Sequence, residues 1–410
     1  MKRRIAVLKF GGTSVADPEK ISRAAERAVA MRKQGFQVAV VVSAPGEMTD
    51  ELIGLARRMA PEPDPRELDH LMSTGEIVGI SLFCMACRAQ GSPAVSLSGP
   101  QAGFRCEGPP TVSTIKSIRP KRIHAELDAG RIVAVAGFQA LAPNGDTATL
   151  GRGGSDLSAV ALAAVLKAER CEIFTDVKGV YTADPRVVPD ARKLERVSYE
   201  EMLELSGAGA QVMLARSIEV AQRYGVRLHV RSAFQPGVGT WIEEVPEDTM
   251  EKAHVSSIAH DNGEVRLTVA GLPDRPGVAA TVIAALAEGG VPIDMIVQSS
   301  ATVKGVNDIS FMCPRDSARK AKASLAAAAK KLGARGVDLQ EGVVKITAVG
   351  TGFRRSPKVA ALMFSTLAKA KINIEMITTS DLKVCCVVST EHADVALRAL
   401  HKAFGLGRRG

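Results

Sequence analysis

The stretch Leu150-Gly-Arg-Gly-Gly-Ser-Asp-Leu157 decides the fold, because it opens an apolar run over residues 157–168. The run has the length of a helix, and the glycines before it allow a tight loop where backbone N–H groups at the helix start meet an anion. Arg152 adds a planar guanidinium suited to a carboxylate or phosphate, and Asp156 adds a fixed negative charge. We therefore predict an anion-binding loop between a strand and a helix.

A second glycine loop, Lys9-Phe10-Gly11-Gly12-Thr13-Ser14, follows the strand-like residues 5–8. One such loop is most often an ordinary turn. Two of them, one with a lysine and one with an arginine, suit chemistry between two anions and indicate phosphoryl transfer. The chain contains neither the G-x-x-x-x-G-K-[ST] motif of P-loop enzymes nor the motif set of protein kinases.

Length and composition narrow the class of protein. The 410 residues are enough for two or three domains. The net charge of +9 is spread along the chain, so we expect anionic small molecules and no nucleic acid as partners. We expect no membrane span and no signal peptide. The 7 irregularly spaced cysteines favour reduced thiols in a cytoplasmic protein, with Cys84 and Cys87 on a buried helix.

Strand-like and helix-like runs alternate over residues 1–245, which predicts helices that cover a mainly parallel sheet. Residues 246–262 are polar and aperiodic, and we expect a linker there. The expected strands are residues 38–42, 94–97, 132–136 and 172–175, and the expected helices are residues 19–32, 77–90 and 157–167.

An internal repeat fills the C-terminal third. Val265-Arg-Leu-Thr-Val-Ala-Gly271 matches Val344-Lys-Ile-Thr-Ala-Val-Gly350, and Ile293-Asp-Met-Ile296 matches Ile374-Glu-Met-Ile377. Each copy predicts a βαββαβ sandwich, at residues 263–340 and 341–410. The second copy has no evident last strand, and linker residues 254–259 could supply one.

Together these motifs resemble the aspartate kinases, members of the amino-acid kinase superfamily with two C-terminal ACT domains. The resemblance also rests on Ser43-Ala44, Ser73-Thr-Gly-Glu76, Ala136-Gly-Phe138 and Thr175-Asp-Val-Lys-Gly-Val-Tyr-Thr-Ala-Asp-Pro-Arg186. It implies an α/β fold: a three-layer kinase domain with a mainly parallel sheet, plus two ferredoxin-like ACT domains. It also implies phosphorylation of L-aspartate by ATP with Mg²⁺, on the route to lysine, threonine, methionine and diaminopimelate.

The resemblance also implies a set of site residues. Lys9 would stabilise the transferring phosphoryl group, Arg152 would hold the α-carboxylate of aspartate, and Asp156 would help Glu76 to hold the α-amino group. The other expected aspartate-binding residues are Ser43, Thr49, Gly153, Gly154 and Ser155. Besides Lys9, the expected ATP-binding residues are Phe10, Gly11, Gly12, Thr175, Asp176, Tyr181, Arg186, Gln211 and Val212. Mg²⁺ is expected on phosphates and water, without assigned protein ligands.

Regulation by amino-acid effectors, lysine and/or threonine, is implied as well. So is a homo-oligomer, or an assembly with a shorter regulatory chain, formed through the ACT domains. The expected effector residues are Asp274, Gly277, Ile293, Asp294 and Gln298 in the first ACT domain, and Val359, Ala360, Asn373, Ile374, Thr379 and Ser380 in the second.

The chain departs from the family pattern at Gln211, where a lysine is usual, at Lys178, where an acid is usual, and at Pro292 and Lys358 in the effector loops. Two alternatives stay open. One is a kinase for another small carboxylate or for a nucleoside monophosphate, against which the Ser-Thr-Gly-Glu segment argues. The other is a non-catalytic amino-acid sensor, which Gln211 favours and the retained polar residues of the expected site oppose.

Overall fold

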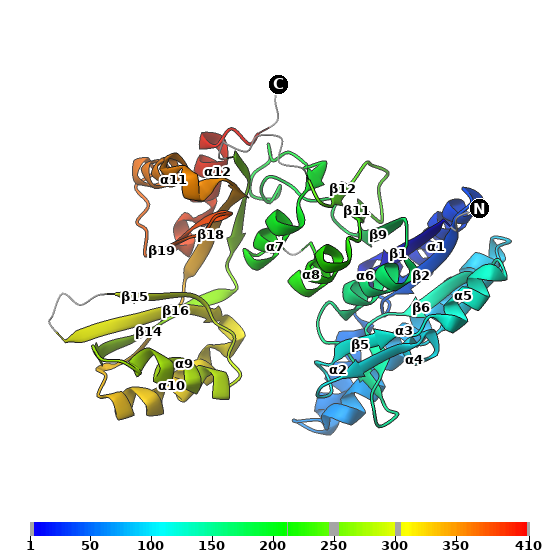
Figure 1. Ribbon diagram of the computed structural model, residues 1–410, viewed down its shortest axis with the longest axis horizontal. Coiled ribbons are helices and arrows are strands. Elements are labelled where there is room, and N and C mark those ends of the chain that lie inside the picture. Colours follow the sequence, from blue (N-terminus) through cyan, green and yellow to red (C-terminus); the bar gives the residue numbers. More distant parts are fainter. Residues whose placement is uncertain (1–3, 211, 246–253, 300–304, 408–410) are drawn as a thin grey trace. The chain divides into compact units, whose positions relative to one another are not determined.

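The computed structural model describes residues 4–210, 212–245, 254–299 and 305–407 (Figure 1). The chain divides into two compact units. The first comprises Met1–Val180, Lys193–Ser206 and Gln211–Glu247, and the second comprises Tyr181–Arg192, Gly207–Ala210 and Asp248–Gly410. The second unit therefore includes two short segments that precede the linker in sequence.

The first unit is built on an eight-stranded sheet in the order β10-β12-β11-β9-β1-β2-β6-β3. Every neighbouring pair is parallel except β11 and β12, which confirms the predicted mainly parallel sheet. The strands are β1 (Ile5–Phe10), β2 (Gln37–Val42), β3 (Ala94–Leu97), β6 (Ile132–Ala136), β9 (Arg170–Thr175), β10 (Arg196–Val197), β11 (Leu228–Ser232) and β12 (Thr240–Ile242).

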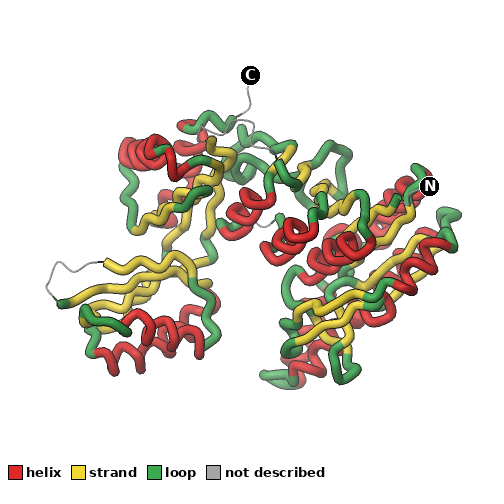
Figure 2. Tube along the Cα trace, viewed as in Figure 1, coloured by secondary structure: helices red, strands yellow, loops and turns green. Residues whose placement is uncertain are grey.

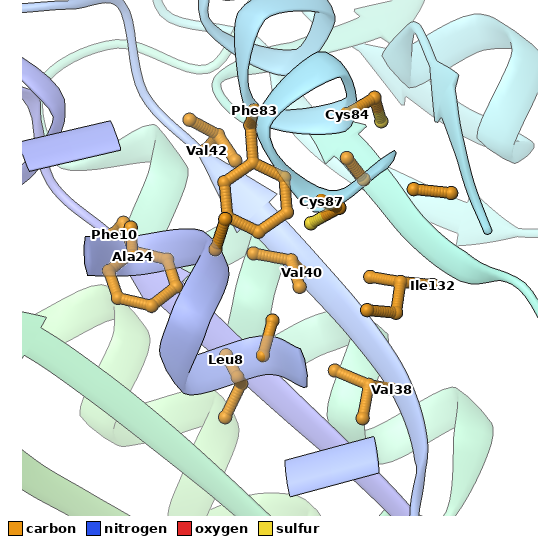
Figure 3. Packing of buried hydrophobic residues seen from close by; sticks show 14 of the residues in the cluster. Leu8, Phe10, Ala24, Val38, Val40, Val42, Phe83, Cys84, Cys87 and Ile132 are labelled. Atoms are coloured by element: carbon orange, nitrogen blue, oxygen red, sulfur yellow. The ribbon is translucent and has the colours of Figure 1, made fainter. Parts of the chain in front are cut away.

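Helices cover both faces of this sheet (Figure 2). On one face, α1 (Pro18–Lys33) and α3 (Pro65–Ala89) pack against alternate residues of β1 and β2. Leu8, Val40, Phe83, Cys84 and Cys87 meet in this core (Figure 3). On the other face lies α6 (Gly154–Leu166), with α8 (Ala215–Tyr224) against it. The two cysteines are buried free thiols, as expected.

Helix α3 begins twelve residues before the helix predicted at 77–90. Asp64 caps it by accepting hydrogen bonds from the backbone N–H groups of Arg66 and Glu67, and Pro65 occupies the first turn. In the first half of α3 the helical spacing of apolar residues is interrupted, because Asp69, Ser73 and Glu76 occupy the buried face. By length and composition α3 could cross a membrane, but 50% of its most apolar window is buried, as in a core helix.

A smaller four-stranded sheet, in the order β5-β4-β7-β8, lies beside the main one. Its strands are β4 (Phe104–Glu107), β5 (Thr114–Ile118), β7 (Gln139–Leu141) and β8 (Thr147–Thr149). The remaining helices of the first unit are η1 (Gly12–Val15), α2 (Met48–Met59), α4 (Gly99–Ala102), α5 (Lys121–Asp128) and α7 (Tyr199–Gly207), which ends in the second unit.

The second unit contains two antiparallel sheets, β15-β16-β14-β17 and β13-β18-β20-β19. The strand β13, which precedes the first ACT domain in sequence, pairs with β18 and completes the sheet of the second. The strands are β13 (His254–Asp261), β14 (Glu264–Pro273), β15 (Asp294–Ser299), β16 (Val306–Pro314), β17 (Gly336–Gln340), β18 (Val343–Thr351), β19 (Met376–Thr379) and β20 (Lys383–Ser389). The helices are α9 (Val278–Glu288), η2 (Arg315–Ser317), α10 (Ala318–Leu332), η3 (Phe353–Arg355), α11 (Pro357–Lys369), η4 (Thr390–His392) and α12 (Ala393–Ala403).

Each ACT sheet carries its own helices on one face and meets the other sheet with the opposite face. Along β20, Cys386 packs in the core beneath α11 and α12, whereas Cys385 belongs to an apolar cluster with Met295 and Met312 of the first ACT domain. Adjacent residues of a strand point to opposite faces, so one strand serves both cores. The two ACT sheets therefore share an interface inside one chain.

Candidate active site

Four neighbouring parallel strands, β9, β1, β2 and β6, end at the same edge of the main sheet. Hydrogen bonds join the loops that follow them. Gly11 N donates to Phe174 O at 3.5 Å, Ser43 N donates to Phe10 O at 3.1 Å, and Gly137 N donates to Val42 O at 3.1 Å. In open α/β sheets, ligands bind in the crevice beyond the carboxyl ends of the strands.

The two glycine loops predicted from sequence meet at this edge. Lys9 Nζ lies 2.7 Å from Asp156 Oδ1, with side chains 11% and 14% exposed. Gly11 leaves room for the ammonium group, because a Cβ there would lie 3.2 Å from Lys9 Nζ. Asp156, which is expected to help Glu76 hold the α-amino group of aspartate, pairs with Lys9 in the structure.

The loop that carries Arg152 requires its glycines. Gly153 adopts φ +69°, and a Cβ there would lie 1.9 Å from Leu214 Cδ1. A Cβ on Gly137 would lie 2.7 Å from Ser155 Oγ, so that glycine lets the start of α6 approach β6. Arg152 itself is exposed and has no hydrogen-bond or ion-pair partner among the described residues. Its guanidinium is available to a ligand.

Glu76 is a buried carboxylate with an unused oxygen. It is 2% exposed, and Oε1 accepts a hydrogen bond from Ala44 N at 3.3 Å, whereas Oε2 has no partner. Burial raises the pKa of Glu76 to about 7. Gly75 and Gly79 bring α3 close, since Cβ atoms there would lie 2.8 Å from Ala44 Cβ and 2.7 Å from Ser43 O. The second oxygen can accept a hydrogen bond from a cation.

The remaining aspartate-binding candidates lie near this edge. Ser43 follows β2 and is half-buried, and Thr49 is half-buried in the first turn of α2. Gly46 N donates to Gly12 O at 3.0 Å, which joins the loop between them to the Lys9 loop. The loop after β2, which carries Ser43, thus contacts both the Lys9 loop and Glu76.

The nucleotide-binding candidates are less closely grouped. Thr175 follows β9 and donates a hydrogen bond to Asp176 Oδ1 at 3.0 Å. Phe10 stacks on Phe174 with ring centroids 4.8 Å apart and is 1% exposed, so its side chain serves the core. Val212 is half-buried, and Gln211 lies outside the described residues.

Tyr181 and Arg186 belong to the second unit. Tyr181 packs against the core of the second ACT domain, and Arg186 pairs with Asp184 at 2.8 Å. The segment is held there by Thr182, whose Oγ1 lies 2.9 Å from His401 Nε2 of α12 and whose carbonyl accepts from Ile258 N at 2.8 Å. Half of the predicted nucleotide segment is therefore attached to an ACT domain.

The effector candidates divide into surface and core residues. Asp274, Gly277, Gln298, Asn373, Thr379 and Ser380 are exposed, whereas Ile293, Val359, Ala360 and Ile374 pack in or against the ACT cores. Asp294 pairs with Lys345 at 2.6 Å. Among the buried polar groups that sequence reasoning missed are Lys345 and Asp69, each of which interrupts an apolar pattern without any local motif.

Comparisons with known proteins identify the chain. Residues 4–232 match the amino acid kinase family, and residues 265–328 and 346–404 match the ACT domain. The aspartokinase of Mycolicibacterium smegmatis is 45% identical over 406 residues, which cover 98% of this chain and 96% of that protein. The structure is similar to that of E. coli aspartokinase III in complex with aspartate and ADP, with a TM-score of 0.82, 25% identity, and coverage of 98% of this chain and 99% of that one.

A second structure of E. coli aspartokinase III, in complex with lysine and aspartate, gives a TM-score of 0.77 at 25% identity, over 98% of this chain and 99% of that one. Both the sequence and the structural similarities extend over nearly the whole chain, through the kinase domain and both ACT domains. The chain therefore belongs to the aspartokinases of the amino acid kinase family.

Proposed function

We propose that this chain transfers the γ-phosphoryl group of ATP to the β-carboxylate of L-aspartate and releases 4-phospho-L-aspartate and ADP. The observation that supports this best is the convergence of Lys9, Asp156 and Glu76 at one edge of the parallel sheet. A bond forms between a β-carboxylate oxygen and the γ-phosphorus while the bond to the bridging oxygen breaks. The electron pair of that bond leaves with ADP.

Lys9 would supply the electrostatic stabilisation. Its ammonium, fixed by Asp156, is placed to offset the negative charge on the oxygens of the transferring group. A carboxylate is already a nucleophile, so the reaction requires no general base. This agrees with a site that is built from fixed charges and glycine loops.

Aspartate would be recognised through its two α-substituents. The free Oε2 of Glu76 would accept a hydrogen bond from the α-ammonium, and Arg152 would hold the α-carboxylate by a bidentate pair. The hydroxyls of Ser43 and Thr49 would orient the β-carboxylate. Backbone N–H groups of Gly153 and Ser155, at the start of α6, would add donors for the anions, and the Gly154 N–H closes the loop by donating to Gly151 O at 2.9 Å.

ATP would lie over the first glycine loop, in which Gly12 allows close approach of the backbone at Gly46, where a Cβ on Gly12 would lie 2.8 Å from Gly46 O. Thr175, Asp176 and the segment at 211–212, which belong to the same unit, would contact the nucleotide. Among the described residues, no group of three or more His, Cys, Asp or Glu side chains could hold a metal ion. Mg²⁺ would be bound mainly by the phosphates and water, where it would neutralise phosphate charge.

The ACT domains would make the enzyme sensitive to lysine and/or threonine. E. coli aspartokinase III, which shares the architecture, has been crystallised with lysine. The exposed candidates for effector contacts are Asp274, Gly277 and Gln298, with Asn373, Thr379 and Ser380 in the second domain. We further propose a cytoplasmic enzyme that assembles as a homo-oligomer, or with a shorter regulatory chain, through these domains.

The decisive experiment measures ADP release by the full-length protein with ATP, Mg²⁺ and L-aspartate, L-glutamate or no amino acid. Trapping with hydroxylamine detects the acyl phosphate as a hydroxamate. We expect ADP and hydroxamate in equal amounts with aspartate only. Equal activity with glutamate would favour a kinase for another carboxylate, and absence of turnover with intact effector binding would favour the sensor.

A further inference from the structure

Asp69 is a buried carboxylate that none of the roles above uses. It lies on the inner face of α3 and is 1% exposed. Oδ2 accepts hydrogen bonds from Thr111 N at 2.9 Å and Thr149 N at 3.0 Å, and Oδ1 accepts one from the Thr149 hydroxyl. Three donors surround the carboxylate, which offsets the cost of burying its charge.

Thr111 and Thr149, which carry these donors, lie on the two segments that support the Arg152 loop. Thr149 ends β8 and is fully buried, and only two residues separate it from Arg152 along the chain. Thr111 flanks the loop from the other side, because a Cβ on Gly151 would lie 3.1 Å from Thr111 O. The Asp69 carboxylate therefore links the loop to α3 at its base.

The same helix face also carries Glu76, two turns further along α3. Between them, Ser73 O accepts a hydrogen bond from Gln139 Nε2 at 3.0 Å, which ties α3 to β7. From the opposite side of the loop, Arg216 Nη1 donates to Leu150 O at 2.9 Å. Leu150 is thus held by α8, and Asp69 connects the start of the loop to α3, the helix that carries the group proposed for the α-ammonium.

We propose that Asp69 is a positioning residue that sets the distance between Arg152 and Glu76. By fixing the base of the arginine loop to α3, it makes the guanidinium and the Glu76 carboxylate act together on one α-amino acid. At 1% exposure it does not touch the substrate itself. The inference rests on the proposed function, in which Arg152 holds the α-carboxylate of aspartate.

The variant Asp69→Asn tests this role, because it keeps the shape of the side chain but turns an NH₂ donor toward groups that are themselves donors. The measurement is the ratio of kcat/KM for L-aspartate to kcat/KM for its α-amide, in which the α-carboxylate is neutralised. We expect the ratio to fall about tenfold or more, the size of one lost charged contact, with the KM for ATP unchanged within about twofold.

Asp394→Asn is the control. Its carboxylate lies in the first turn of α12, in the second ACT domain, with Oδ2 3.4 Å from Arg398 Nη2. We expect a wild-type ratio. A purely structural role of Asp69 would lower the melting temperature and the folded yield of Asp69→Asn but leave the ratio of the folded enzyme unchanged, which would overturn the inference.

Arg152→Lys separates this inference from the proposed function. If Arg152→Lys lowers the ratio and Asp69→Asn does not, Asp69 has no positioning role. If Arg152→Lys leaves the ratio intact, the assignment of Arg152 fails instead. In the double variant with both Asp69→Asn and Arg152→Lys, the two reductions of the kcat/KM ratio should not add, because Asp69 acts through Arg152. Should Asp69→Asn fail to fold, Thr149→Val removes one donor only, and an unchanged ratio in that variant contradicts the proposal.

Discussion

Lys345 of the second ACT domain and Asp294 of the first form an ion pair across the intrachain interface, with Nζ 2.6 Å from Oδ2. Lys345 also contacts Glu264 at 3.0 Å. The internal repeat aligns Lys345 with Arg266 and Asp294 with Glu375, and Arg266 Nη1 lies 3.1 Å from Glu375 Oε2. In each ACT domain, therefore, the basic residue pairs with the acidic residue of the other domain. The two ion pairs occupy equivalent positions of the repeat.

Lys345→Met is expected to destabilise the ACT interface. Burial lowers the pKa of Lys345, but the carboxylates of Glu264 and Asp294 more than offset this, and the net pKa is raised. Removing the cation leaves buried negative charge uncompensated, which costs about 3 kcal/mol. A thermal melt should show a clearly lower Tm, whereas Arg354→Met, at an 82% exposed residue, should cost less than about 1 kcal/mol. Equal melting temperatures would show that the pair is not stabilising.

Lys9→Ala should lower kcat by about a hundredfold or more, the usual effect of losing one oriented electrostatic group. The KM values for ATP and aspartate should change much less, because Lys9 acts on charge that develops during transfer. Steady-state kinetics measure both quantities. Lys116→Ala removes a lysine from an exposed ion pair with Glu107 and is the control. Near-normal turnover in Lys9→Ala would exclude a catalytic role.

Arg152→Lys should reduce kcat/KM for aspartate by about ten- to a hundredfold, because an ammonium cannot reproduce the two parallel hydrogen bonds of a guanidinium. ATP binding should survive, since the nucleotide contacts are proposed on other loops. Kinetics with each substrate varied in turn separate the two effects. An unchanged KM and kcat for aspartate would contradict the assignment.

Protonation of Glu76 should determine the acidic limb of the pH profile of kcat/KM for aspartate. Its pKa of about 7 means that the free enzyme must lose a proton before it can hold an ammonium. The value of kcat/KM for aspartate should therefore rise about tenfold per pH unit below 7 and level off above it. Glu76→Gln should abolish this limb and weaken aspartate binding. A limb that persists in Glu76→Gln must belong to another group.

The same titration predicts how stability depends on pH. The pKa of Glu76 is raised above its ordinary value of 4.5, so between the two values the folded state holds more protons than the unfolded state. Stability should accordingly fall as the pH rises from about 4.5 to 7, by up to about 3 kcal/mol from this group. Thermal melts of the wild type and Glu76→Gln over this range measure the difference, and saturating aspartate should reduce it.

Effector control predicts that lysine, threonine or both lower the kinase rate at millimolar concentrations. Asp274 is exposed and its Oδ1 accepts a hydrogen bond from Asn307 Nδ2 at 2.8 Å, so Asp274→Ala should weaken the response without changing the uninhibited rate. Coupling is reciprocal, so aspartate should raise the effector concentration required. If neither amino acid changes the rate or the Tm of the wild type, the ACT domains have a structural role only.

The regular parts of the fold could be predicted from the sequence, and the contacts between distant segments could not. The strands at 94–97 and 132–136 match the predicted bounds because short, continuous apolar runs mark buried parallel strands. The first half of α3 was missed because Asp69 and Glu76 replace apolar residues on its buried face. The Lys9–Asp156 contact depends on the order of the strands, which no local pattern reveals.

The packing of Tyr181–Arg192 on the second ACT domain has a consequence for the modularity of the chain. Ala183, Val188 and Ala191 of this segment are buried in one hydrophobic cluster with Ile258 of β13 and Leu400 of α12. A fragment that starts just before β13 would keep all strands from β13 to β20 but lose this apolar cover. An independently expressed regulatory half must therefore expose that patch to water or shield it by self-association.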